Sequence, residues 1–210
     1  HFMMKEIYEQ PKAVADTIHP RIKDGKIVIE ELGLSDEDIR KISRIQMVAC
    51  GSAYHVCAAA KYVLEKLSGI PVDIDLASEF RYRNPILSEH TLVVIVSQSG
   101  ETADTLAAMR LAKQAGAFTI AIVNVVSSTI AREADGVLYT WAGPEISVAT
   151  TKAYSAQLSA LYLISVKIAR VRGLISIGDE RALCAELQRL PECIEQTLKC
   201  QSDMQRIPTL

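Results

Sequence analysis

The run Ser97-Gln98-Ser99-Gly100-Glu101-Thr102 brings three hydroxyls, an amide and a glycine together in six residues. An apolar stretch precedes it and a stretch with helical periodicity follows it over 103–115, which predicts a turn between a buried strand and a helix. The N-terminus of a helix has unpaired N–H groups and a partial positive charge, which suit an anion. Gly100 allows close approach of the backbone, and hydroxyls donate to phosphate oxygens. Helix capping is the alternative interpretation, because Ser and Thr are preferred there.

Two further hydroxyl-rich turns are present. Cys50-Gly51-Ser52 follows a short apolar run, and Ser147 to Thr151 opens a long helical pattern. Ligands of a doubly wound sheet bind at the carboxyl ends of its strands. Although each turn alone could be a helix cap, their recurrence predicts one shared pocket for a small anion. No lysine or arginine lies in the 97–102 turn, so hydroxyls and backbone amides would have to bind that anion.

Other motifs that carry chemistry are missing from the sequence. It contains neither a G-x-G-x-x-G loop, nor a G-x-x-x-x-G-K-[ST] loop, nor a G-x-S-x-G elbow. Cys50 stands near no recognisable His/Asp constellation and is predicted to be a buried thiol, and His55 is predicted to be structural. We assign no catalytic residue, because the candidates Glu79, Glu101, Glu145, His55 and Lys152 have no visible activating partner. No cofactor is predicted.

Composition narrows the class of protein further. Of the 210 residues 49% are hydrophobic and 23% charged, which predicts a globular core, and the net charge is -2. Dispersed basic residues and 5% aromatics give no support for binding nucleic acid.

The cysteines and the absence of targeting segments indicate the compartment. The five cysteines form no CxxC pair, which favours buried thiols in a reducing compartment over a zinc site. Without a signal peptide or an apolar run long enough to span a membrane, we expect a cytoplasmic protein, and the start at His1 indicates a piece of a longer chain.

The order of predicted elements gives the fold class. Five apolar strand candidates, at 45–50, 72–76, 92–96, 118–123 and 136–140, alternate with helices at 53–67, 77–82, 103–115, 128–133 and 151–172. This alternation predicts an α/β fold with a five-stranded parallel sheet flanked by helices, doubly wound and flavodoxin-like. We divide the chain into a helical lead-in (1–43), the sheet-containing domain (44–175) and a helical exit (176–210).

The flanking segments carry their own signals. The pattern over 3–18 predicts a helix that is interrupted at Pro11, or two short pieces. Asp24-Gly25 is typical of a turn, and Ser35 with Asp38 predicts the start of a short helix. Two separate helices are predicted at the end of the chain, over 180–188 and 192–201.

The 97–105 segment resembles the phosphosugar loop of the sugar isomerase (SIS) fold. The segments 50–52, 77–83 and 145–153 are also similar to the first SIS half of the glutamine:fructose-6-phosphate amidotransferases, and 1–11 resembles the segment that follows the glutaminase domain in that family. The resemblance implies that fructose 6-phosphate accepts ammonia and is isomerised to glucosamine 6-phosphate by a homodimer, without metal or cofactor. By resemblance the phosphate is held by Ser97, Gln98, Ser99 and Thr102, and the sugar side is lined by Gly51, Ser52, Val148 and Thr150.

One position departs from the family, because Ala53 stands where a serine is common. The resemblance places the glutaminase domain and the second SIS half outside this sequence, and with them the groups for proton transfer. We therefore expect the 210 residues alone to bind fructose 6-phosphate without turning it over. The alternatives are a phosphosugar deglycase or deaminase-isomerase of the same fold, and the phosphosugar-sensing domain of a transcriptional regulator. The 1–11 segment argues against the sensor.

Overall fold

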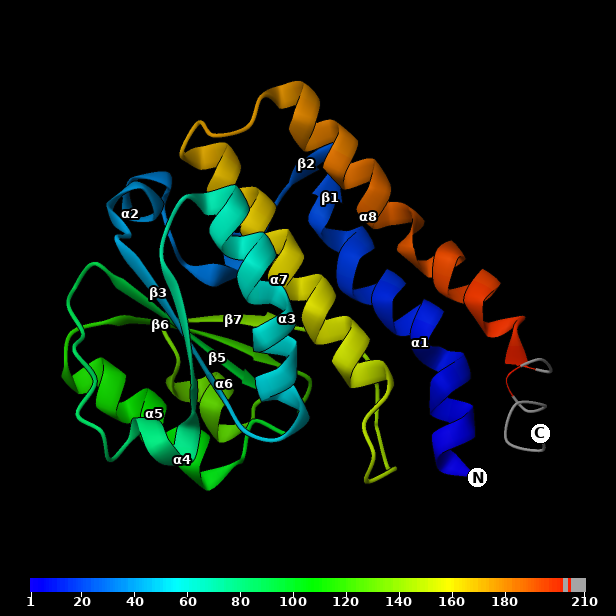
Figure 1. Cartoon of the computed structure of the whole chain (residues 1–210), viewed down its shortest axis with the longest axis horizontal. Helices are drawn as coiled ribbons and strands as arrows, with labels where there is room; N and C mark the ends of the chain where they lie inside the picture. The colour runs from blue at the N-terminus through cyan, green and yellow to red at the C-terminus, as the bar shows by residue number, and fades with distance from the viewer. Residues whose placement is uncertain (202–203, 205–210) are drawn as a thin grey trace.

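The computed structural model describes residues 1–201 and 204, and its centre is a parallel sheet (Figure 1). The strands are β3 (Arg44–Ala49), β4 (Val72–Leu76), β5 (Thr91–Ser97), β6 (Phe118–Val123) and β7 (Gly136–Tyr139). They pair in the order β4-β3-β5-β6-β7, and every pair is parallel. The chain thus runs from β3 outward to β4 and then returns to the other side of β3, which is the flavodoxin-like strand order. The predicted fold class is confirmed.

Helices cover both faces of the sheet (Figure 1). One face packs against α3 (Ser52–Ser68) and α7 (Lys152–Val171), and the other against α4 (Ala77–Phe80), α5 (Ala103–Gln114) and α6 (Thr129–Glu133). The side chains of β5 show how helices on both faces determine which residues a strand must contain. Val94 and Val96 belong to the apolar cluster under α3 and α7, whereas Val93 and Ile95 belong to the cluster under α5. Since successive side chains point to opposite faces, a strand buried on both sides must be apolar throughout.

Helix α1 (Phe2–Ile18) is continuous through Pro11, so the predicted interruption is wrong. Proline has no N–H and leaves the carbonyl of Ile7 without its usual helical partner. The side-chain amide of Gln10 donates to that carbonyl at 3.1 Å. A neighbouring side chain therefore replaces the hydrogen bond that the proline removes.

Helix α8 (Ile177–Leu198) is a single helix, and the prediction of two helices is wrong here too. It begins at a capping box in which Ser176 and Asp179 exchange hydrogen bonds with each other's backbone N–H. Leu187 lies before Pro191 and Ile194 after it, yet both pack against the same apolar cluster. Burial on both sides of the proline favours a continuous helix over two separate ones.

The remaining elements are short. A 3₁₀ turn (His19–Arg21) leads into a hairpin of β1 (Ile22–Lys23) and β2 (Lys26–Ile27), which closes at the predicted Asp24-Gly25 turn. A second 3₁₀ turn (Glu30–Leu32) precedes α2 (Asp36–Lys41), whose capping box joins Ser35 and Asp38 as predicted. None of the helices in residues 1–201 is long and apolar enough to cross a membrane.

The terminal segments and the sheet share one core. Val14 and Ile18 of α1 and Cys184 of α8 belong to the same apolar cluster as Met47 and Val94 of the sheet. The division at residues 43 and 175 stays a prediction, and the last residues of the predicted exit segment lie outside the described part of the chain.

The prediction of buried thiols is confirmed for only two of the five cysteines. Cys57 and Cys184 are buried, and burial raises the pKa of Cys57 to about 12 and that of Cys184 to about 11. Cys193 and Cys200 are exposed. Cys50 is half-buried rather than buried.

Candidate functional site

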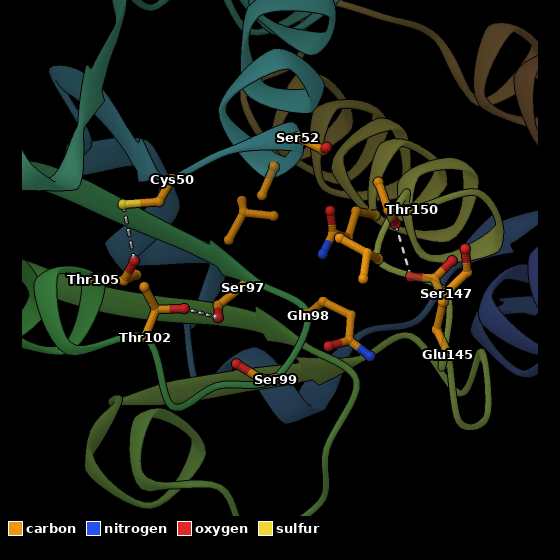
Figure 2. Close-up of a pocket in the computed structure, with 14 residues that line it drawn as sticks. Cys50, Ser52, Ser97, Gln98, Ser99, Thr102, Thr105, Glu145, Ser147 and Thr150 are labelled. Carbon is orange, nitrogen blue, oxygen red and sulfur yellow. Dashed lines mark hydrogen bonds between the residues drawn. The ribbon is translucent and has the colours of Figure 1, made fainter.

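A cavity of about 250 Å³ lies at the carboxyl ends of β3 and β5, where the direction of the sheet's winding reverses (Figure 2). Three segments form it: the β3–α3 turn, the β5–α5 turn and the loop that precedes α7. This is the position at which doubly wound sheets bind ligands. Seven of the eight residues assigned from the sequence line it, namely Ser52, Ser97, Gln98, Ser99, Thr102, Val148 and Thr150.

Gly51, the eighth, is not among the residues that line the cavity. Its backbone has φ 58° and ψ −137°, a conformation that side chains with a Cβ rarely adopt. A Cβ built at this position would meet nothing within 4 Å. The glycine is therefore required by the sharp turn from β3 into α3, which aims Ser52 at the cavity, and not by a close neighbour.

The β5–α5 turn holds its own hydroxyls in place. The Ser97 hydroxyl accepts the N–H of Gly100 at 3.1 Å, and the Ser99 hydroxyl accepts the N–H of Glu101 at 3.2 Å. Ser97 and Thr102 also approach each other, with 3.5 Å between their hydroxyl oxygens. Because the Ser99 hydroxyl only accepts within the turn, its hydrogen can be donated to a ligand. Ser97 and Thr102 share one hydrogen between their two oxygens, which leaves one further hydroxyl hydrogen of this pair to donate. The turn thus presents donors to a ligand rich in acceptors.

Helix capping does not account for the hydroxyl of Thr102. Thr102 occupies the N-cap position of α5, but its side chain makes no capping hydrogen bond. The first N–H groups of this 12-residue helix are consequently not claimed by the Thr102 hydroxyl. The capping alternative is therefore wrong for Thr102, whereas Ser97 and Ser99 do bond to backbone N–H groups of the turn that precedes α5.

Gly100 is fixed by both its backbone and its surroundings. Its φ is 67°, and a Cβ at this position would lie 2.1 Å from the hydroxyl oxygen of Ser128. Ser128 is buried, and its hydroxyl has no hydrogen-bond partner among the described residues. The close packing of α6 against the turn therefore requires glycine here.

The loop before α7 forms the opposite wall, and Glu145 organises it. Its carboxylate accepts from the Thr150 hydroxyl at 2.7 Å and from the N–H groups of Thr151 at 2.8 Å and Ala153 at 3.3 Å. Glu145 therefore satisfies the N-terminus of α7, and Thr150 and Ser147 are held at the edge of the cavity. Since the Thr150 hydroxyl donates to Glu145, it faces the cavity as an acceptor.

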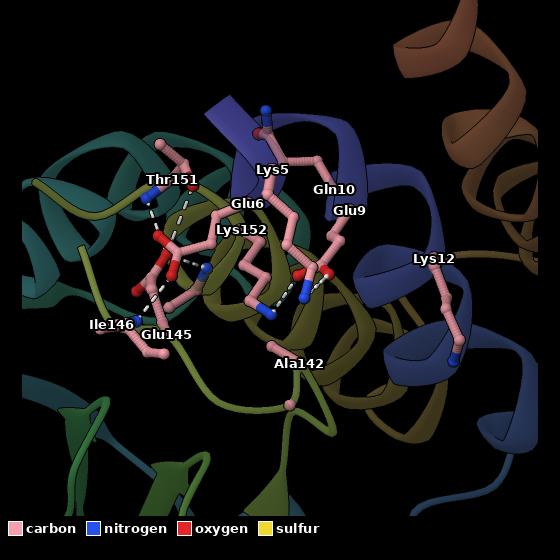
Figure 3. A network of polar contacts seen from close by, with 12 residues as sticks. Lys5, Glu6, Glu9, Gln10, Lys12, Ala142, Glu145, Ile146, Thr151 and Lys152 are labelled. Atoms are coloured by element: carbon pink, nitrogen blue, oxygen red, sulfur yellow. Dashed lines mark hydrogen bonds and ion pairs between the residues drawn. The ribbon is translucent and has the colours of Figure 1, made fainter. Parts of the chain in front are cut away.

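Helix α1 supports this loop from outside the cavity (Figure 3). The carboxylate of Glu6, which is only 3% exposed, accepts from the N–H of Ile146 at 2.6 Å and from that of Ser147 at 3.2 Å. The Lys152 ammonium donates to Glu9 at 2.7 Å, and this hydrogen bond lowers the pKa of Glu9. Lys152 is buried and faces α1 rather than the cavity.

Several lining residues were not assigned from the sequence: Cys50, Ala53, Val96, Thr105, Glu145, Ser147 and Gln157. Cys50 was predicted to be buried, but it is half-buried beside the cavity, and its sulfur accepts from the Thr105 hydroxyl at 3.8 Å. Ser147 lies in a turn that the sequence had singled out as rich in hydroxyls. For Gln157 the sequence offers one indication of a role in the site: it is the only side-chain amide in a strongly apolar helical stretch.

The cavity is polar without being cationic. Neither lysine, arginine nor histidine is among the described residues that line it, and Glu145 is its carboxylate. Glu145 is already engaged with α7, and Glu101 accepts from the Thr129 N–H at 2.7 Å, which lowers the pKa of Glu101. This arrangement can bind a small, acceptor-rich molecule through neutral donors.

Comparison with known protein families identifies this arrangement. The model of the SIS domain matches residues 38–167. The chain belongs to the SIS domain family. The match includes the sheet, the three segments around the cavity and most of α7.

Relatives of this SIS domain share much of its sequence. It is 53% identical over 199 residues to the isomerising glutamine–fructose-6-phosphate aminotransferase of Caldanaerobacter subterraneus, a match that covers 94% of this chain and 33% of the relative. The enzyme of the same name from Clostridium tetani is 50% identical over 208 residues, with 99% and 34% coverage. The chain thus spans about a third of the length of these relatives.

A solved structure gives the same result. The C-terminal domain of glucosamine-fructose-6-phosphate aminotransferase from Francisella tularensis superposes with a TM-score of 0.94 at 38% identity. The match covers 99% of this chain and 58% of that one. The SIS domain described here therefore corresponds to part of a larger domain in that protein.

Proposed function

We propose that this SIS domain binds fructose 6-phosphate as the first sugar-binding half of an isomerising glutamine–fructose-6-phosphate aminotransferase. The proposal is supported by relatives of that name at about 50% identity over nearly the whole chain. The observation that carries it is the cavity, where the hydroxyls of Ser97, Ser99 and Thr102 lie next to the N-terminus of α5. A hydroxyl or amide hydrogen bond to a charged group is stronger than one between neutral groups.

The two ends of the ligand have different surroundings. The phosphate is bound by Ser97, Gln98, Ser99 and Thr102 together with the first N–H groups of α5. The sugar lies toward Ser52, Val148 and Thr150, where Thr150 accepts from a sugar hydroxyl. Gly51 contributes through the backbone conformation that places Ser52.

The reaction itself needs more than these residues. Glu101 and Glu145 are held by backbone N–H groups, and Lys152 is paired with Glu9. General acid–base catalysis requires a group within reach of the proton it moves. In our proposal the complete protein supplies such groups from other parts, works as a cytoplasmic homodimer and makes glucosamine 6-phosphate.

Within that protein, we propose that residues 44–175 form the SIS domain that binds the sugar phosphate.

Titration calorimetry of the 210-residue chain with fructose 6-phosphate, glucosamine 6-phosphate and inorganic phosphate tests the proposal. We expect both sugar phosphates to bind, and inorganic phosphate to bind more weakly because it lacks the sugar contacts. A coupled assay for glucose 6-phosphate formation should show no turnover of fructose 6-phosphate. Failure of both sugar phosphates to bind contradicts the proposed ligand, and release of ammonia from glucosamine 6-phosphate supports a deaminase instead.

A further inference from the structure

The side chain of Gln157 lines the cavity and forms no hydrogen bond with the described part of the protein. The residue lies in the second turn of α7 and is 3% exposed. Its amide atoms are not among the fully enclosed, unpartnered polar atoms of the described residues, so the amide meets the cavity rather than the protein interior. Side-chain amides that do not bond within the protein bond to water or to a ligand.

Other buried polar side chains nearby are satisfied within the protein. On the same helix Ser159 donates to the carbonyl of Ser155 at 2.8 Å, and Ser165 donates to that of Leu161 at 2.7 Å. Gln46, a glutamine that is equally buried in the sheet, donates to Asp75 at 2.8 Å. Gln157 therefore differs from its neighbours in having its hydrogen-bonding groups directed at the cavity instead of at the protein.

The position of Gln157 separates it from the phosphate-binding turn. Helix α7 covers one face of the sheet, and α5, which follows the 97–102 turn, covers the other. Thr150 lies on the α7 side of the cavity and Thr102 on the α5 side (Figure 2). A ligand whose phosphate lies at the 97–102 turn extends its remaining atoms toward α7.

The chemistry of the amide favours a polyol over a phosphate. A phosphate dianion only accepts hydrogen bonds, and donors for it are present in the 97–102 turn. A primary amide donates through its NH₂ and accepts through its oxygen, as a sugar hydroxyl also does. We propose that Gln157 hydrogen-bonds hydroxyl groups of the hexose and so sets the preference for a sugar phosphate over phosphate alone. This inference rests on the proposed function.

Substitution Gln157→Met tests it, since methionine is similar in length and apolar. We expect the Kd for fructose 6-phosphate to rise about 3- to 10-fold, the effect of losing one or two neutral hydrogen bonds. The Kd for inorganic phosphate should stay unchanged. Ser159→Ala is the matched control on the same helix, because Ser159 bonds only within the helix, and it should leave both Kd values unchanged.

The outcomes separate the inference from the proposed function. Equal losses for both ligands would indicate a structural role and overturn the inference, as would an unchanged Kd for fructose 6-phosphate. If the unsubstituted chain does not bind fructose 6-phosphate, the proposed function is wrong and this inference with it. If Gln157→Met does not fold, NMR of the unsubstituted chain decides. The side-chain amide resonances of Gln157 should shift with fructose 6-phosphate and not with inorganic phosphate, and the reverse result overturns the inference.

Discussion

The two walls of the cavity are held in place by different means. In the 97–102 turn, serine hydroxyls bond to backbone N–H groups two and three residues away. In the loop before α7, the carboxylate of Glu6 reaches across 140 residues of sequence to the backbone of Ile146. The first wall, the 97–102 turn, is thus shaped internally by neutral hydroxyls and joined to α6 through Gly100 and Glu101. The second wall, the loop before α7, is joined to α1 by the buried carboxylate of Glu6.

This difference has a functional consequence. The 97–102 turn keeps its shape for as long as β5, α5 and the adjoining α6 are folded. A loop that is held by α1 keeps its shape only while α1 stays in place. The phosphate side of the site should thus be robust, and the sugar side should respond to changes outside the cavity.

Gly100→Ala should have the largest effect, because it breaks the first wall from within. The new Cβ meets the Ser128 hydroxyl at 2.1 Å, and φ of 67° is unfavourable for alanine. We expect the free energy of unfolding to fall by about 2–5 kcal/mol, as measured by urea denaturation. Ser128→Gly in the same chain removes the clash and should restore part of the loss. If the double variant is as unstable as Gly100→Ala alone, the contact with Ser128 is not the cause.

Ser99→Ala should remove binding without unfolding the chain. A hydrogen bond to a charged group contributes about 1.5–3 kcal/mol, so the Kd should rise about 10- to 150-fold for fructose 6-phosphate. Inorganic phosphate should lose affinity in parallel, in contrast to the Gln157→Met variant. Ser43→Ala is the control for calorimetry, because Ser43 is exposed and precedes β3, at the opposite end of this strand from the cavity. Unchanged affinity in a folded Ser99→Ala chain contradicts the phosphate assignment.

The two walls also differ in how well the sequence predicts them. The hydroxyl turn, its strand and its helix were predictable, because the serine hydroxyls bond to N–H groups only two or three residues away. The strands were predictable for a similar reason, since burial on both faces requires continuous apolar residues. The bonds that join the turn to α6 were not predictable, because they link residues about 30 positions apart. Glu6 could not be predicted, because a glutamate in an amphipathic helix is usually solvated, and only the packing of α1 brings it to Ile146. The continuity of α1 and α8 through their prolines likewise depends on a neighbouring amide and on burial.

Glu6→Gln should weaken the second wall while sparing the first. An amide accepts from the N–H groups of Ile146 and Ser147 less strongly than a carboxylate does, so we expect a loss of about 1–2 kcal/mol of stability. The Kd for fructose 6-phosphate should rise about 3- to 10-fold, and that for inorganic phosphate should not change. Glu192→Gln, at an exposed position on α8, serves as the control. Equal losses for both ligands would show that the two walls are not independent.

Protonation of Glu9 at acid pH should weaken the second wall, and the loss of stability should be smaller than in the predictions for Gly100→Ala and Glu6→Gln. The hydrogen bond from Lys152 lowers the pKa of Glu9 in the folded chain below that of an unfolded glutamate, about 4.3. A lowered folded pKa means that the carboxylate stabilises the folded state above pH 4.3 and that this contribution is lost as the pH falls through the folded value. One-third of the Glu9 side chain is exposed, so solvent screening limits the pH-dependent part of the stability to about 1 kcal/mol or less.

The unfolding free energies of the parent chain and of the Lys152→Gln variant are compared between neutral and acid pH. The difference between the two chains should shrink on acidification. Lys12→Gln, which removes an exposed partner of Asp16 on the same helix, should give a smaller difference. A stability difference for Lys152→Gln that does not depend on pH would show that the ion pair with Glu9 does not anchor the loop.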